Sequence, residues 1–283
     1  MTTEKIDTIQ KALDCAIRDA ENMTEQGGYD NGKKVYPNYM HKDAWKRYLQ
    51  EIPDDIKKRI KKELAGNPPH MASFGSSCRM AYNRLKKVKN IVFEYGLPTE
   101  VGGTAQLDAY IQDKKFEIFV EAKCREIYKE HYGDKAYKEV YKFLREWDKK
   151  FDFDAEKRTF SYDGEEVVHF DLKQLICHFL GITAGLLNGT ITAEKVRFVY
   201  LIYNPNDVKE FIADDKYRDE ILEQYQATLD EIDLFDMKEL FKTIYEFQKE
   251  NLKIKRNIKE GFIVESCFEF KLVDQNHLNG LFD

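Results

Sequence analysis

The sequence predicts a mixed α/β protein in which helices cover both faces of a central sheet. Three short strand-like runs follow one another in the middle of the chain, and a strongly apolar helical segment and a further strand-like run come after them. Helical patterns occupy both ends of the chain. The expected core therefore has the order helix, three strands, helix, strand, with N-terminal and C-terminal helical extensions.

The first seventy residues are expected to be mainly helical. Apolar residues recur at a spacing of three and four over residues 4–23, and a polar, Gly-rich connection covers 26–34. A second helix is expected from Pro53 to Gly66. Its basic run, residues 57–62, is interpreted as a solvated helix face, with phosphate contact as the less favoured alternative.

The predicted core begins with a helix whose first turn would be capped by Ser76 or Ser77. Three strands are expected after it, at 91–97, 105–111 and 116–122, because β-branched and aromatic residues are frequent there and turn-forming residues separate the runs. The connections are short enough for antiparallel hairpins.

The second half of the chain alternates helical and strand-like patterns. The expected elements are a charged helical insertion at 126–150, a polar hairpin at Asp163-Gly164, a buried helix at 171–187, a strand at 196–203, acidic helices over 207–252 and a final strand over 261–273.

The length of 283 residues allows one large domain with additions. We predict an N-terminal helical extension (1–68), a core (69–206) and an acidic helical region with a final strand that packs on the core (207–283).

Composition excludes several classes of protein. No apolar run approaches the roughly 18–20 residues of a transmembrane helix, and charges are scattered through residues 1–20, which is unlike a signal peptide. The five cysteines are odd in number and widely spaced, which fits neither a disulfide framework nor a zinc knuckle. We therefore expect a cytoplasmic protein without a membrane partner.

The net charge of −6 does not exclude a nucleic-acid partner, because it is unevenly distributed. Residues 207–240 carry −8, so the remainder of the chain carries +2, and no acidic residue lies between Met71 and Phe93. Electrostatic fields in salt act over about 8–10 Å, so the local charge decides.

Strand alternation brings chemically useful side chains together. Glu121 and Lys123 lie two residues apart and therefore on one face of their strand, and Asp108 lies in the preceding strand. Hairpin pairing would place Asp108 beside Glu121. Two carboxylates suit Mg²⁺, and a nearby lysine would orient or deprotonate a water or neutralise a transition state.

The alternative interpretation is an ordinary surface salt-bridge cluster worth about 0–1 kcal/mol. A second Glu-x-Lys, at Glu269 and Lys271, shows that the tripeptide alone carries little information. It has no aspartate in a neighbouring upstream strand.

Asp108, Glu121-Ala122-Lys123 and the helix that follows Asp171 resemble the PD-(D/E)xK nuclease superfamily. The runs 69–77, 106–110 and 121–131 are similar to a bacterial restriction-endonuclease-like group. The resemblance covers 69–203 and departs from the pattern at Leu107, where proline is usual. It implies a restriction-endonuclease-like fold, metal ligation by Asp108, Glu121 and the Ala122 carbonyl, Mg²⁺ (or Mn²⁺ in its place) as the cofactor and Lys123 as the catalytic lysine.

Further site residues follow from the same resemblance. Glu94 is preferred to Glu100 as an additional acidic ligand, with a plain exposed glutamate as the alternative. Gln174 and His178 share a helix face, where some superfamily members place Gln-x-x-x-Tyr, so Gln174 is a candidate catalytic residue. His178 would equally suit a core histidine, and His131 is a further uncertain candidate.

The helix before the strands is the candidate nucleic-acid contact, with a solvated face as the alternative. The residues concerned are Arg79, Asn83, Arg84 and Lys86.

The expected function is Mg²⁺-dependent hydrolysis of DNA phosphodiester bonds in restriction or defence. The alternatives are an inactive nucleic-acid-binding or interaction scaffold, an acidic docking surface over 207–252, and RNA cleavage. Either a monomer or a homodimer is compatible with the pattern.

Overall fold

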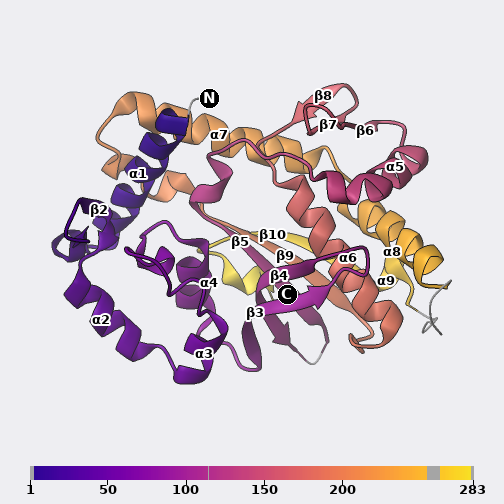
Figure 1. The fold of residues 1–283 in the computed structure, drawn as a ribbon, viewed down its shortest axis with the longest axis horizontal. Helices are drawn as coiled ribbons and strands as arrows, with labels where there is room; N and C mark the ends of the chain where they lie inside the picture. The colour runs from indigo at the N-terminus through magenta and orange to yellow at the C-terminus, as the bar shows by residue number, and fades with distance from the viewer. Residues whose placement is uncertain (1–2, 114, 254–261, 282–283) are drawn as a thin grey trace.

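A five-stranded mixed sheet forms the centre of the computed structural model, which describes residues 3–113, 115–253 and 262–281 (Figure 1). The strand order is β10-β9-β5-β4-β3. Its strands are β3 (Ile91–Pro98), β4 (Thr104–Gln112), β5 (Glu117–Lys123), β9 (Val196–Ile202) and β10 (Phe268–Asp274). The first three form an antiparallel meander, and β9 and β10 run parallel to β5. The protein is therefore mixed α/β, as the sequence predicts.

Helices α4 (Ser77–Leu85) and α6 (Leu172–Asn188) pack against the middle of this sheet. α4 contacts β4 and β5, and α6 contacts β3 and β4. Thirteen of the 17 residues of α6 are buried, which explains its apolar pattern on most sides. Gly181 allows the close approach, because a Cβ there would lie 2.7 Å from the Cβ of Ala105. Every residue of β5 and β9 is buried, so both faces of the sheet centre are covered.

The N-terminal region differs from the prediction. After α1 (Thr3–Ala20), the expected loop contains the hairpin β1 (Gly27–Asp30) and β2 (Val35–Met40), which turns at Gly32. The Asp30 side chain accepts a hydrogen bond from the Gly32 amide, and this local turn outweighs the polar composition.

The helices of this region also differ from expectation. α2 (Lys42–Glu51) was not predicted, and α3 (Asp54–Arg59) is shorter than expected. The chain continues from Arg59 to Gly66 in turns, so the expected helix is wrong over its second half.

The insertion between β5 and α6 is helical only in its second part. α5 (Lys138–Trp147) is followed by a small antiparallel sheet of β6 (Phe151–Asp154), β7 (Thr159–Tyr162) and β8 (Glu165–Val167). The hairpin predicted at Asp163-Gly164 joins β7 to β8.

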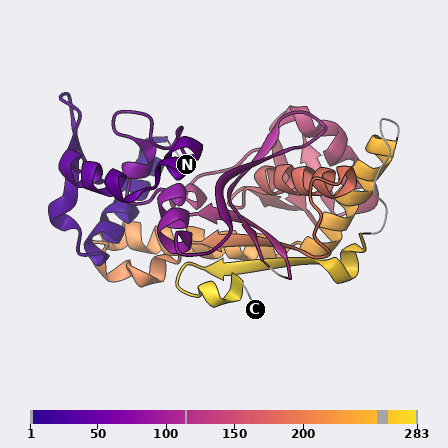
Figure 2. The same ribbon diagram turned by 90° about the horizontal axis from the view of Figure 1, so that it is seen from below.

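The C-terminal region contains α7 (Asp215–Asp233) and α8 (Met237–Lys253). α8 contacts β10, the edge strand of the sheet, which Figure 2 shows in yellow. The final strand begins later than predicted, because the residues before it form the single turn α9 (Val264–Cys267). Gly261, the expected start, lies outside the described residues. The short 3-10 turns are η1 (Thr24–Gln26), η2 (His70–Ala72), η3 (Arg125–Ile127), η4 (Lys135–Tyr137), η5 (Pro205–Asp207), η6 (Lys209–Phe211) and η7 (Leu278–Leu281).

All five cysteines are free thiols. Among the described helices, none combines the length and apolar character needed to cross a bilayer.

A buried carboxylate joins the N-terminal region to the sheet. Asp14 on α1 is fully buried, and its Oδ2 accepts hydrogen bonds from Asn38 Nδ2 (2.8 Å), Ser73 Oγ (2.8 Å) and Arg125 Nη1 (2.9 Å). Arg125 lies two residues beyond the end of β5. Burial raises the pKa of Asp14, and Arg125, Asn38 and Ser73 act against that rise. These hydrogen bonds join α1 to the residues just beyond β5.

Gly75 is required by this cluster. A Cβ at Gly75 would lie 1.8 Å from Asp14 Oδ1, so we expect Gly75→Ala to lower the free energy of unfolding by at least about 2 kcal/mol. Gly189→Ala is the control, because its methyl would meet no atom within 4 Å and only its left-handed φ of 78° costs energy there, on the order of 1 kcal/mol. Urea denaturation measures both, and an equal loss in the two variants would contradict the contact.

Candidate acidic site at the end of strand β5

The end of β5 brings Asp108 and Glu121 together, as hairpin pairing predicts. The β4–β5 ladder runs as far as the pair Ala109–Val120. Beyond it, Asp108 Oδ2 accepts a hydrogen bond from the Ala122 amide at 2.8 Å. The aspartate side chain thus binds the backbone of β5 beside Glu121.

Glu121 and Lys123 form a buried ion pair that faces α6. Lys123 Nζ lies 2.9 Å from Glu121 Oε1, and the two residues are 5% and 3% exposed. The same ammonium donates to Gln174 Oε1 and lies 4.0 Å from Asp171 Oδ2. Gln174, predicted from its helix face, therefore belongs to the site.

Both members of this pair are charged. Burial opposes ionisation of Glu121, but Lys123 and His178 outweigh it and lower the pKa of this carboxyl. Burial also opposes the charge on Lys123, yet the Glu121 carboxylate raises the pKa of the ammonium. With Glu121 as its partner, Lys123 therefore carries a positive charge.

The negative charges of two further carboxylates, those of Asp108 and Glu94, are poorly balanced by nearby positive charge. Burial and then Glu121 raise the pKa of Asp108 well above its usual value, although the residue is partly exposed at its surface. Burial, then Glu63 and Glu121, raise the pKa of Glu94 to about 7. Three acidic groups thus share a region that lacks enough positive charge, which is a feature of cation sites.

Glu94 occupies a distorted part of β3. Its φ is 52°, an uncommon value for a non-glycine residue, and the β3–β4 ladder is interrupted there, where the register places it opposite Asp108. Glu100, the other candidate ligand, lies in the turn between β3 and β4. Glu63 was not anticipated, because it lies about thirty residues earlier with no motif around it.

The donor set matches a hard divalent cation in its chemistry. Asp108 and Glu121 supply carboxylate oxygens. The third predicted ligand is the carbonyl oxygen of Ala122, a residue whose backbone amide donates to Asp108. Within the described residues, no three His, Cys, Asp or Glu side chains are arranged closely enough to hold a metal. Any ion here would therefore keep several waters, as Mg²⁺ commonly does.

Both candidate histidines contact carboxylates of the site. His178 is 1% exposed, and its Nε2 lies 2.9 Å from Glu121 Oε2, at ion-pair distance but without the angle of a hydrogen bond. His131 Nδ1 lies 3.1 Å from Asp171 Oδ2, and its other ring nitrogen meets the Glu126 carbonyl.

Asp171 in turn caps α6 by accepting from the Gln174 amide. Burial opposes its charge, but His131 and Lys123 lower the pKa of Asp171. The histidines thus hold the carboxylates around Lys123.

Only some of the side chains predicted to contact nucleic acid on α4 are exposed. Arg79 is 4% exposed and donates to the Phe74 carbonyl (3.1 Å) and to Glu21 Oε2 (2.6 Å), so its assignment to phosphate contact is corrected: it is a buried packing residue. Asn83 accepts from the Tyr48 hydroxyl at 2.9 Å. Arg84 and Lys86 remain exposed.

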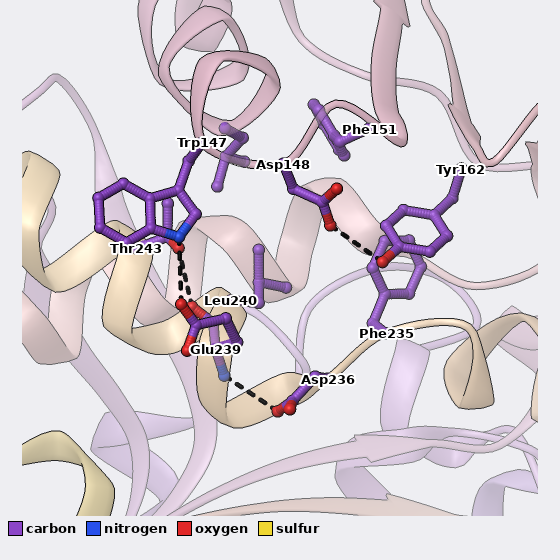
Figure 3. A pocket seen from close by; sticks show the side chains of 10 residues that line it. Trp147, Asp148, Phe151, Tyr162, Phe235, Asp236, Glu239, Leu240 and Thr243 are labelled. Atoms are coloured by element: carbon purple, nitrogen blue, oxygen red, sulfur yellow. Dashed lines mark hydrogen bonds between the residues drawn. The ribbon is translucent and has the colours of Figure 1, made fainter.

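An apolar cavity of about 80 Å³ lies elsewhere, between α5, the small sheet and the start of α8 (Figure 3). Its two best-placed polar groups are already paired, since Trp147 Nε1 donates to Glu239 Oε1 (3.1 Å) and the Tyr162 hydroxyl to Asp148 Oδ2 (2.9 Å). It shares no lining residue with the acidic site. We place the chemistry at the acidic site, because charged groups converge there.

Comparisons with protein-family models, with curated proteins and with solved structures found no match for this chain.

The pKa of Glu94 leads to a pH-dependent prediction. Below about pH 4.5 the carboxyl is protonated in both folded and unfolded states, and between 4.5 and 7 only the unfolded state ionises, so the parent loses stability as pH rises. Glu94→Gln should therefore match the parent near pH 4 and exceed it at pH 8 by on the order of 1–3 kcal/mol. Urea denaturation at both values measures this, with the exposed Glu165→Gln as control; an equal effect at both pH values would refute it.

Proposed function

We propose that this protein is a divalent-metal-dependent nuclease that hydrolyses DNA phosphodiester bonds on a restriction-endonuclease-like core. The observation that carries the proposal is the meeting of Glu121 and Lys123, at the end of β5, with Asp108 of the paired strand β4 and with Gln174 of α6. The element order α4, β3, β4, β5, α6, β9 supports it, since this is the order that the sequence resemblance implies.

The metal would be held by Asp108, Glu121 and the Ala122 carbonyl, with Glu94 as a further ligand. Mg²⁺, or Mn²⁺ in its place, supplies Lewis acidity toward a phosphate oxygen and lowers the pKa of a bound water. The shortage of positive charge around Asp108 and Glu94 supports a cation at this point.

The protein's own residues would stabilise the charge that develops on the phosphate and hold the Lys123 ammonium in place. Lys123 holds a positive charge in a low-dielectric setting, where it stabilises the negative charge that develops on a phosphate during hydrolysis. Gln174 and Glu121 fix the ammonium in place, so little reorganisation is needed.

The biological setting is proposed from the resemblance. Restriction or defence against foreign DNA in the cytoplasm fits it best, and a homodimer would allow both strands of a duplex to be cut. Repair or recombination would use the same chemistry.

One observation favours a second candidate, an inactive scaffold. Glu121 is already flanked by Lys123 and His178, and Asp108 already accepts from Ala122, so these groups have partners without a metal. Calorimetric titration with Mn²⁺ separates the candidates. A nuclease should bind Mn²⁺ and lose that binding in Glu121→Gln, whereas no binding by the parent would favour the scaffold.

The catalytic role of Lys123 is tested with plasmid and linear DNA in Mn²⁺. We expect cleavage by the parent and a loss of at least about 10²-fold in Lys123→Ala, the scale of a removed electrostatic group. Lys271→Ala is the matched control, because Lys271 lies in the second Glu-x-Lys, where Glu269 pairs with Arg197 at 2.7 Å. Equal cleavage by parent and Lys123→Ala would indicate a contaminant and defeat the assignment.

A further inference from the structure

Four exposed cations follow one another at the end of α3. We call Lys58, Arg59, Lys61 and Lys62 the basic segment; all four are exposed, and no described residue forms an ion pair with any of them. The neighbouring Lys57 is different, since it is partly buried and its Nζ lies 3.0 Å from Asp54 Oδ1. The basic segment therefore presents four exposed positive charges, and Glu63 is the acidic residue that follows it.

The backbone under these side chains is held in place. Ile60, in the middle of the basic segment, is fully buried in the hydrophobic core. The amide of Leu64 donates to the Ile60 carbonyl (3.1 Å), and the amide of Met71 donates to the Glu63 carbonyl (2.9 Å). An ordered turn, rather than a free loop, presents the four cations.

The basic segment borders the acidic site. α3 packs against β3, the strand that carries Glu94, and the two elements lie next to each other in Figure 1. The basic segment lies at and just after the end of α3, and β3 is paired with β4, the strand that carries Asp108. A ligand that extends from the carboxylates across β3 toward α3 would therefore approach the basic segment.

This arrangement suits a polyanion that extends beyond the acidic site. Duplex DNA carries one negative charge per about 1.7 Å of its axis, so phosphates on either side of a bond held at Asp108 and Glu121 would meet nearby cations. α4 offers less, since Arg79 is buried and Asn83 is bound to Tyr48.

We propose that the basic segment binds the phosphate backbone of duplex DNA beside the acidic site. This inference rests on the proposed nuclease function for the choice of DNA. Contacts of this kind position the duplex and carry no sequence information, so the basic segment contributes affinity rather than a recognition sequence.

Salt dependence tests the inference, because each phosphate contact contributes about 0.9 to the slope of log affinity against log salt. Binding of a fluorescent 30-base-pair duplex, without divalent metal, is followed by anisotropy from 50 to 200 mM KCl. The test variant combines Lys58→Gln, Arg59→Gln, Lys61→Gln and Lys62→Gln. We expect affinity at 100 mM salt to fall at least about 10-fold and the slope to flatten by roughly 2–4.

A charge-matched control excludes a general effect of net charge. It combines Lys149→Gln, Lys157→Gln, Lys209→Gln and Lys216→Gln, four exposed lysines from other parts of the chain. The control should bind as the parent does. Equal slopes and affinities in the two quadruple variants would overturn the inference, as would a parent that binds single-stranded RNA but not duplex DNA.

The binding and cleavage results separate this inference from the proposed function. If only the test variant loses DNA binding, and the parent cleaves no DNA with Mn²⁺, the basic segment is supported and the nuclease function is refuted. If the parent cleaves DNA and the test variant binds DNA as the parent does, the nuclease function is supported and the role of the basic segment is refuted.

Discussion

The buried ion pair between Glu121 and Lys123 is the interaction on which the site depends. Removing both charges from water is costly, and a buried pair persists only where further polar groups complete its surroundings. Here α6 supplies them: Gln174 accepts from the ammonium, and His178 lies against the carboxylate. The pair therefore ties the end of β5 to α6, so the same contacts that would serve chemistry also fix the helix on the sheet.

Negative charge remains in excess around this pair. The Asp108 carboxylate, instead of a backbone carbonyl of β4, accepts the hydrogen bond of the Ala122 amide on β5. Glu94 lies opposite Asp108 in a left-handed backbone conformation. Such arrangements lower the stability of an isolated chain, and they persist where surrounding structure enforces them. Asp14 and Arg125 connect α1 to the residues just beyond Lys123. The N-terminal region is thus part of the framework that supports the site.

The two Glu-x-Lys sequences show why context decides the role of a short motif. Glu269 is neutralised by Arg197 across the β9–β10 pair, and no aspartate of a neighbouring strand was expected beside it. Glu121 has Asp108 on the adjoining strand and α6 above it. A distinction of this kind follows from strand pairing, and the order of strands and helices along the chain was sufficient to anticipate it.

The sequence by itself determined what depends on local periodicity. Alternation along β5 placed Glu121 and Lys123 together, a short turn brought Asp108 to them, and helical spacing put Gln174 and His178 on one face. Only the tertiary structure decided which charges are exposed. It buried Arg79 against Glu21, brought Glu63 within reach of Glu94, and joined His131 to Asp171. These contacts link residues that no short repeat relates, because side-chain packing over long separations fixes them.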